Sequence, residues 1–160
     1  MIPVIRLHHA MLYVRELDRS VDFYREAFGF DEIARENGMV SLLRLPGSPN
    51  QHDLALLQVG DKAPRPARGT TGLYHLAWEV PAIEDLVDAA KQLSAMRALT
   101  GASDHGATKS IYGRDPDGIE FEVTWMVPRL YWGEWANHGV VRPLDLDLEL
   151  QRWGRPVARA

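Results

Sequence analysis

The chain contains one pattern twice, a strand followed by a helix and three strands, and this repeat limits the folds that it can form. The two copies begin with "HAMLYVRELDRSVDFYREAFGF" from His9 and "HLAWEVPAIEDLVDAAKQLSAM" from His75. In each copy a histidine opens a short apolar run, a valine follows five residues later, and a helical pattern begins at once. We therefore expect an α+β fold of two tandem βαβββ modules, whose paired mixed sheets curve around a shared cleft.

The elements of each module follow from the spacing of their apolar residues. The first helix is expected from about Asp18 to Phe28, with Asp18 or Ser20 as its cap, and the second from about Ala82 to Met96. Three strand-like segments follow each helix: "FDEIAREN", "MVSLLRL" and "HDLALLQVG", then "RALTGA", "TKSIYGRD" and "IEFEVTW".

We expect residues 1–160 to form a single domain. Its first module spans about residues 5–62 and its second about residues 72–127, joined by the linker-like "GDKAPRPARGTTG". A C-terminal extension of about residues 128–160 loses the strand pattern and is rich in tryptophan. Because indole rings are costly to expose, we expect the extension to cover a sheet or to contact a second subunit.

The composition excludes several classes of protein. The absence of cysteine rules out disulfides, iron–sulfur clusters and zinc–thiolate sites, so any metal must be held by nitrogen and oxygen ligands. A formal charge of −4 without a Lys/Arg-rich patch argues against nucleic acid as a partner. Since we find neither an apolar run of about 20 residues nor a secretion signal at the start, we expect no membrane partner and a cytoplasmic location.

A carboxylate in the segment "YGRDPDGIEFEVTW" needs a partner. Asp-Gly at Asp117 and Gly118 indicates a tight turn, in which Asp115 and Asp117 are expected to bond the local backbone. The alternation of apolar residues that follows indicates a strand, and Glu122 lies on the opposite face of that strand, near its middle. Isolating such a carboxylate from water would cost roughly several kcal/mol, so a cation or a set of donors must face it.

Two histidines occupy equivalent places in the repeat. Side chains alternate along a strand, so the adjacent His8 and His9 face opposite ways, and only His9 matches His75. Two imidazoles and the Glu122 carboxylate form the set that typically binds Fe(II) and leaves positions open for substrate and dioxygen. In the alternative interpretation, both histidines are ordinary core or rim residues and Glu122 pairs with an arginine.

At these residues the chain resembles the vicinal oxygen chelate superfamily, which includes glyoxalases, bleomycin-resistance proteins and type I extradiol dioxygenases. The resemblance covers about residues 7–126 and continues through "RPLDLD". The segment "HHAMLYVRELDRSVDFYREAFGF" is shared across the superfamily, whereas "DHGATKSIYGRDPDGIEFEV" is more similar to the extradiol branch. The resemblance implies that the cleft binds a metal through ligands at three positions: His9, His75 and Glu122. It also implies a catalytic tyrosine at Tyr112 and an acid–base histidine at His105.

The chain departs from the family pattern in two places. The extradiol branch carries another acid–base histidine before the second metal ligand, but "DKAPRPARGTTGLY" contains none, and His52 lies far upstream. Glyoxalase-like isomerases usually have a further acidic or amide ligand on the last strand of the first unit. That strand is apolar here, so a four-ligand site would need Gln58 or His52.

The resemblance implies an extradiol-type dioxygenase that cleaves a catechol-like aromatic with O2 at a His-His-Glu Fe(II) site. Mn(II), Zn(II) and Ni(II) are other candidate metals. The partners would be a small aromatic diol and O2, and we expect a homodimer or a higher homo-oligomer. Two alternatives stay open: a glyoxalase-like metal-dependent isomerase, epimerase or lyase, and a metal-free resistance protein that binds an aromatic drug.

Overall fold

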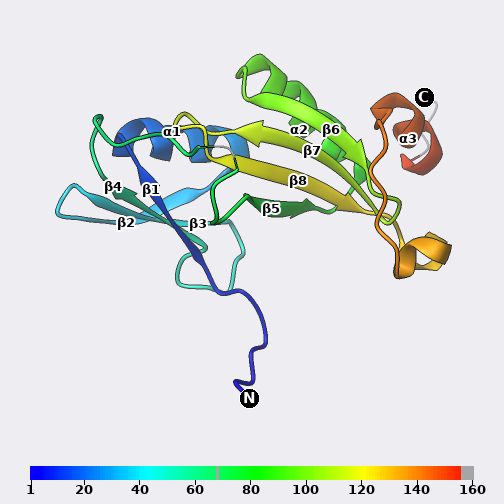
Figure 1. Cartoon of the computed structure of the whole chain (residues 1–160), viewed down its shortest axis with the longest axis horizontal. Helices are drawn as coiled ribbons and strands as arrows, with labels where there is room; N and C mark the ends of the chain where they lie inside the picture. Colours follow the sequence, from blue (N-terminus) through cyan, green and yellow to red (C-terminus); the bar gives the residue numbers. More distant parts are fainter. Residues whose placement is uncertain (68, 156–160) are drawn as a thin grey trace. The chain divides into compact units, whose positions relative to one another are not determined.

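The computed structural model describes residues 1–67 and 69–155. The chain divides into two compact units, Met1–Arg68 with Pro116–Gly118, and Gly69–Asp115 with Ile119–Ala160. Each unit contains a four-stranded mixed sheet and the helix that follows its first strand (Figure 1). The predicted α+β fold of two tandem βαβββ modules is confirmed, whereas a cleft shared by the two sheets stays a prediction. No helix in the described part of the chain is long and apolar enough to cross a bilayer.

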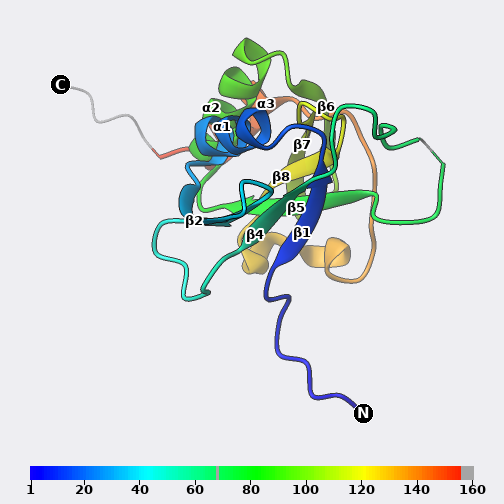
Figure 2. The ribbon, with the colours of Figure 1, turned by 90° about the vertical axis from the view of Figure 1, so that its left-hand side faces the viewer.

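The first unit forms a sheet with the strand order β1-β4-β3-β2. Its elements are β1 (Ala10–Val14), α1 (Leu17–Phe28), β2 (Asp31–Glu36), β3 (Val40–Arg44) and β4 (Leu54–Gln58). Strand β1 runs parallel to β4, and the other neighbours are antiparallel. Helix α1 packs against β3 and β4 on one face of this sheet (Figure 2). The core between helix and sheet is apolar and buried, with Val14, Tyr24, Leu43 and Leu56 among its members.

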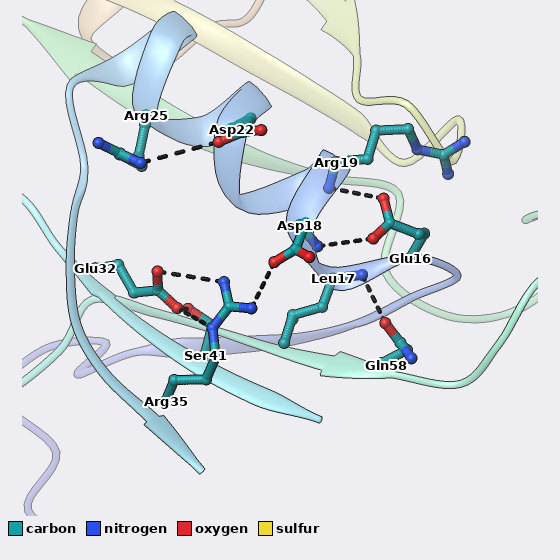
Figure 3. A network of polar contacts seen from close by, with 10 residues as sticks. All are labelled: Glu16, Leu17, Asp18, Arg19, Asp22, Arg25, Glu32, Arg35, Ser41 and Gln58. Atoms are coloured by element: carbon teal, nitrogen blue, oxygen red, sulfur yellow. Dashed lines mark hydrogen bonds and ion pairs between the residues drawn. The ribbon is translucent and has the colours of Figure 1, made fainter. Parts of the chain in front are cut away.

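The N-terminus of α1 is capped by Glu16 rather than by Asp18 or Ser20 (Figure 3). The Glu16 carboxylate accepts hydrogen bonds from the backbone N–H groups two and three residues ahead, at 3.0 and 2.8 Å. The Gln58 side-chain oxygen accepts a third, from the first residue of the helix, at 2.8 Å. Asp18 pairs instead with Arg35, and Ser20 is fully buried inside the helix. A cap therefore forms here because two side chains together satisfy N–H groups that a helix start leaves unpaired.

The Asp-Gly turn serves two purposes. Asp115 accepts a hydrogen bond from the Ile119 N–H at 2.8 Å, which is the local turn contact that the sequence predicts. The expectation of a merely local role is wrong for Asp117, whose side chain is only 3% exposed. Its carboxylate accepts a hydrogen bond from the Arg15 backbone N–H at 2.7 Å and pairs with the guanidinium of Arg19. Asp117 thus joins the turn to the start of α1 within the first unit.

The second unit repeats this arrangement with the strand order β5-β8-β7-β6. Its elements are β5 (His75–Val80), α2 (Ile83–Ala95), β6 (Leu99–Asp104), β7 (Thr108–Arg114) and β8 (Glu120–Met126). Strand β5 is parallel to β8, and helix α2 packs against the sheet (Figure 1). Phe121, Val123 and Trp125 of β8 are buried, whereas Glu122 lies on the other face, as the alternation predicts.

The C-terminal extension packs on the second unit. It contains two short 3₁₀ helices, Arg129–Tyr131 and Gly133–Ala136, and helix α3 (Leu146–Trp153), which packs against α2. The Trp153 ring lies 5.9 Å from the Trp125 ring. The extension was expected to cover a sheet or to contact a second subunit; in the structure its helix packs mainly on α2, and contact with a second subunit stays a prediction.

A buried lysine connects the extension to the sheet. The Lys109 side chain on β7 is 5% exposed, and its Nζ lies 2.5 Å from Asp104 Oδ1 and 3.8 Å from Glu149 Oε2. The Trp153 Nε1–H donates to the same Glu149 carboxylate at 2.8 Å. Two carboxylates and one ammonium group therefore form a charged cluster under α3, which helps to fix the extension in place.

We expect this cluster to make the second unit sensitive to acid. Burial by itself would raise the pKa of Asp104, but hydrogen bonds from Lys109 and from the Gly106 N–H outweigh it and lower this pKa. Because the folded pKa lies below the unfolded value of about 3.9, the stabilisation is present above that pH and is lost as pH falls through the folded pKa. Asp104→Asn should flatten the acid limb of stability in urea unfolding followed by tryptophan fluorescence. The exposed, lysine-paired Asp88 gives a control, since Asp88→Asn should leave the acid limb unchanged.

Candidate metal centre

The partner that Glu122 requires is His75, not an arginine. His75 is the first residue of β5 and Glu122 lies on the adjacent parallel strand β8. The His75 Nε2 atom is 2.9 Å from Glu122 Oε2, and the two side chains are 24% and 13% exposed. Arg114 of the neighbouring strand β7 pairs with Glu120 at 3.2 Å rather than with Glu122. The pair thus stands on one face of the sheet and keeps some access to solvent.

The geometry of this pair fits two ligands of one divalent ion. Two donor atoms that each lie about 2.1 Å from an ion, at right angles, are about 3.0 Å apart. The observed 2.9 Å matches that spacing. The other ring nitrogen, His75 Nδ1, is buried and has no hydrogen-bond partner in the described part of the chain, so the pair lacks the outer acceptor that metal-binding imidazoles usually have. A neutral imidazole and a carboxylate are donors that Fe(II), Mn(II) and Zn(II) all accept.

Tyr112 lies next to this pair on the same sheet. Its position on β7 is directly opposite Glu122 in the antiparallel register, and its ring centroid is 5.9 Å from that of His75. Burial raises the pKa of the Tyr112 hydroxyl, and the negative charge of Glu122 raises it further. Tyr112 therefore keeps its proton at neutral pH.

His105 contacts Tyr112 and so adds a fourth side chain to this group. The His105 Nε2 atom is 2.7 Å from the Tyr112 hydroxyl oxygen, and the His105 Nδ1 atom is 2.8 Å from the backbone oxygen of Val140. The second unit therefore brings together four of the five predicted site residues, in the spatial order His75, Glu122, Tyr112 and His105.

His9 lies in the first unit, one residue before β1 rather than inside a strand. It is exposed, and its ring is 4.4 Å from the ring of His52 and 5.2 Å from that of His8. Burial and the neighbouring His9 and His8 lower the pKa of His52. From the sequence, His52 was considered only as a distant substitute for the acid–base histidine or as a fourth ligand. The parallel pairing of Ala10 with Leu54 places the residues before both strands at the same end of the sheet.

The first unit lacks a counterpart of Glu122. Glu122 pairs in register with Ala77, two residues after His75, and the same step from His9 leads to Met11, which pairs with Ala55. An alanine has no donor atom for a metal. Gln58 does not replace it, because its side-chain oxygen caps α1.

The complete triad of His9, His75 and Glu122 stays a prediction, since His9 belongs to one unit and the other two residues to the second. Among residues 1–67 and 69–155, no group of three or more His, Asp or Glu side chains is arranged to hold a metal ion. By itself the second unit brings together two of the three predicted ligands, His75 and Glu122, with Tyr112 and His105 beside them.

Comparisons with known proteins find dioxygenases among the relatives of this chain. Catechol-2,3-dioxygenase of Bacillus subtilis (strain 168) is 30% identical over 125 residues, which cover 78% of this chain and 42% of that protein. Manganese-dependent 2,3-dihydroxybiphenyl 1,2-dioxygenase of Geobacillus genomosp. 3 is 28% identical over 130 residues, which cover 79% of this chain and 38% of that protein. The chain thus spans less than half the length of these two relatives.

The fold has a close match among solved structures. A glyoxylase/bleomycin resistance protein/dioxygenase domain from Frankia sp. EAN1pec superposes with a TM-score of 0.64 at 24% identity, over 78% of this chain and 99% of that one. Residues 6–123 match the family model of the Glyoxalase/Bleomycin resistance protein/Dioxygenase superfamily. The chain belongs to that superfamily.

Proposed function

We propose that the protein is an extradiol-type dioxygenase, which cleaves a catechol-like aromatic ring with O2 at an Fe(II) site formed by His9, His75 and Glu122. The observation that carries this proposal is the row on the second sheet, where the His75–Glu122 pair is followed by Tyr112 and His105. The two dioxygenase relatives support the same chemistry, and the manganese dependence named for one of them makes Mn(II) the second candidate metal.

The donor set suits an anionic diol. A divalent ion held by two neutral imidazoles and one carboxylate keeps a net charge of about +1, which favours binding of a catecholate. When bound, the metal would hold the diol oxygens and O2 in one coordination sphere, where proximity assists their reaction.

Tyr112 and His105 supply the proton chemistry in this proposal. Tyr112 stands beside the ligand pair and offers its hydroxyl oxygen to a substrate hydroxyl. His105 contacts that same tyrosine oxygen, and imidazole is the side chain best suited to move protons in both directions near neutral pH. The second acid–base histidine of the extradiol branch has no match before His75, so these two residues are the only candidates that the resemblance assigns.

Ala55 favours ring cleavage over isomerisation. A glyoxalase-like isomerase would use a fourth ligand from the last strand of the first unit, and the register places alanine there. A site with three protein ligands leaves more positions for a bidentate diol and for O2, as ring cleavage requires.

The proposal is tested with protein purified under anaerobic conditions. We expect about one Fe(II) or Mn(II) ion per chain by elemental analysis. Addition of O2 and a catechol should give a coloured ring-cleavage product and consume one O2 for each ring opened. Removal of the metal with a chelator should abolish the reaction, and Fe(II) or Mn(II) should restore it. Conversion of hydroxy-carbonyl substrates without O2, supported by nickel, cobalt or zinc, would instead identify an isomerase or lyase.

A further inference from the structure

A backbone carbonyl of the C-terminal extension contacts the candidate site. The backbone oxygen of Val140 lies 2.8 Å from His105 Nδ1, while His105 Nε2 lies 2.7 Å from the Tyr112 hydroxyl. Both contacts are partly buried. The two nitrogens of one imidazole ring are thus occupied by two groups of different hydrogen-bonding character.

The Val140 carbonyl determines which ring nitrogen of His105 carries the proton. A backbone carbonyl only accepts hydrogen bonds, so at this distance Nδ1 must carry a proton that it donates to Val140. In the neutral ring Nε2 then has a lone pair, and it accepts a hydrogen bond from the Tyr112 hydroxyl. We propose that the C-terminal extension is a positioning element of the active site: the Val140 carbonyl holds His105 in its Nδ1–H tautomer and so makes it the proton acceptor for Tyr112.

Three contacts keep the carbonyl in place. Arg142, two residues beyond Val140, pairs with Asp104 of β6 through backbone hydrogen bonds of 2.9 and 3.0 Å. The Arg142 guanidinium lies 4.5 Å from the centre of the Trp135 ring. That ring packs over Gly106, where an added Cβ would approach it to 2.5 Å and where φ is +78°. A glycine next to His105 thus lets the extension come close to the loop.

This arrangement sets the direction of proton flow, an inference that rests on the proposed function. A substrate hydroxyl can transfer its proton to the Tyr112 oxygen as Tyr112 passes its own proton to His105 Nε2. The substrate O–H bond breaks, Tyr112 remains neutral, and the products are a substrate anion and an imidazolium held by Val140. In the opposite tautomer Nε2 carries the proton and faces Tyr112 as an N–H donor. It then cannot accept the proton of Tyr112, so this transfer is blocked.

Nitrogen-15 NMR of the metal-free protein at pH 8 tests the proposal, because the two neutral tautomers have distinct ring-nitrogen shifts. We expect the His105 ring, assigned by its loss in His105→Gln, to show a protonated Nδ1 and an unprotonated Nε2. The same pattern should persist in Tyr112→Phe, since Val140 and not Tyr112 determines it. A His105 ring protonated at Nε2 alone overturns the proposal.

A matched pair of variants separates the carbonyl from the rest of the extension. Arg142→Ala removes the contact with Trp135 but keeps the backbone N–H that bonds Asp104, and it should retain the tautomer. Arg142→Pro also removes that N–H, so Val140 should lose its fixed place and His105 should become a tautomer mixture. An unchanged tautomer in Arg142→Pro would show that the paired extension does not set it.

Activity data then distinguish the two proposals. If ring cleavage is found, Arg142→Pro should lower kcat by about 10-fold or more with KM little changed, because proton transfer and not binding is affected. If no ring cleavage is found but the tautomer result holds, the proposed function fails while the positioning role of Val140 stands.

Discussion

Glu122→Gln should lower the affinity for Fe(II) or Mn(II) by about 100-fold or more, since the loss of a ligand should cost at least as much as the upper end of the 10- to 100-fold loss that mutation of an outer-shell partner causes. The amide keeps the shape of the side chain but loses the negative charge that faces His75 at 2.9 Å. Ring cleavage should fall in proportion at limiting metal. Metal titration of the stripped protein measures the affinity, and circular dichroism checks that the fold is retained.

Glu120→Gln is the matched control for this prediction. Glu120 lies on the same strand and the same face, and its carboxylate pairs with Arg114 at 3.2 Å rather than with a histidine. This variant should bind metal within about threefold of the unaltered protein, as expected for a partly exposed ion pair. Wild-type affinity in Glu122→Gln, or an equal loss in both variants, would exclude Glu122 as a ligand.

Features set by local periodicity could be predicted from the sequence. The repeat predicts both βαβββ modules because the spacing of apolar residues within a short segment distinguishes a helix from a strand. The same reasoning predicts that Glu122 faces away from Phe121 and Val123, and the structure shows this. The half-buried position of Glu122 predicts that a cation or a set of donors faces it, and the structure identifies that partner as His75 on the adjacent parallel strand.

Features that depend on contacts across the chain could not be predicted. The C-terminal extension was expected to cover a sheet or to contact a second subunit, but no local pattern indicates that the Val140 carbonyl contacts His105. The proximity of His52 to His9 follows from the strand pairing, which the sequence alone does not give in register. In the same way, Asp-Gly predicts a turn at Asp117 without indicating the residue that the aspartate side chain bonds.

Asp117→Ala should destabilise the first unit by about 2 kcal/mol, because hydrogen bonds to charged groups contribute about 1.5 to 3 kcal/mol. The carboxylate is buried and accepts a hydrogen bond from the Arg15 backbone N–H at 2.7 Å. Its removal leaves that N–H without an acceptor, whereas the 42% exposed side chain of Arg19 can turn to water. Amide hydrogen exchange of peptides that cover β1 and α1 should become about 30-fold faster, the factor that corresponds to this energy.

Asp22→Ala provides the comparison, because it removes an aspartate that also pairs with an arginine in the first unit (Figure 3). Asp22 and Arg25 are 75% and 59% exposed and 3.9 Å apart, so their loss should change stability by less than about 0.5 kcal/mol. Tryptophan fluorescence cannot replace hydrogen exchange in this comparison, because it reports on the second unit. All five tryptophans lie there: Trp78, Trp125, Trp132, Trp135 and Trp153. Equal exchange rates in the two variants would mean that the buried contact of Asp117 does not stabilise the first unit. Faster exchange confined to Asp117→Ala would show that a turn residue about 100 positions away holds the start of α1.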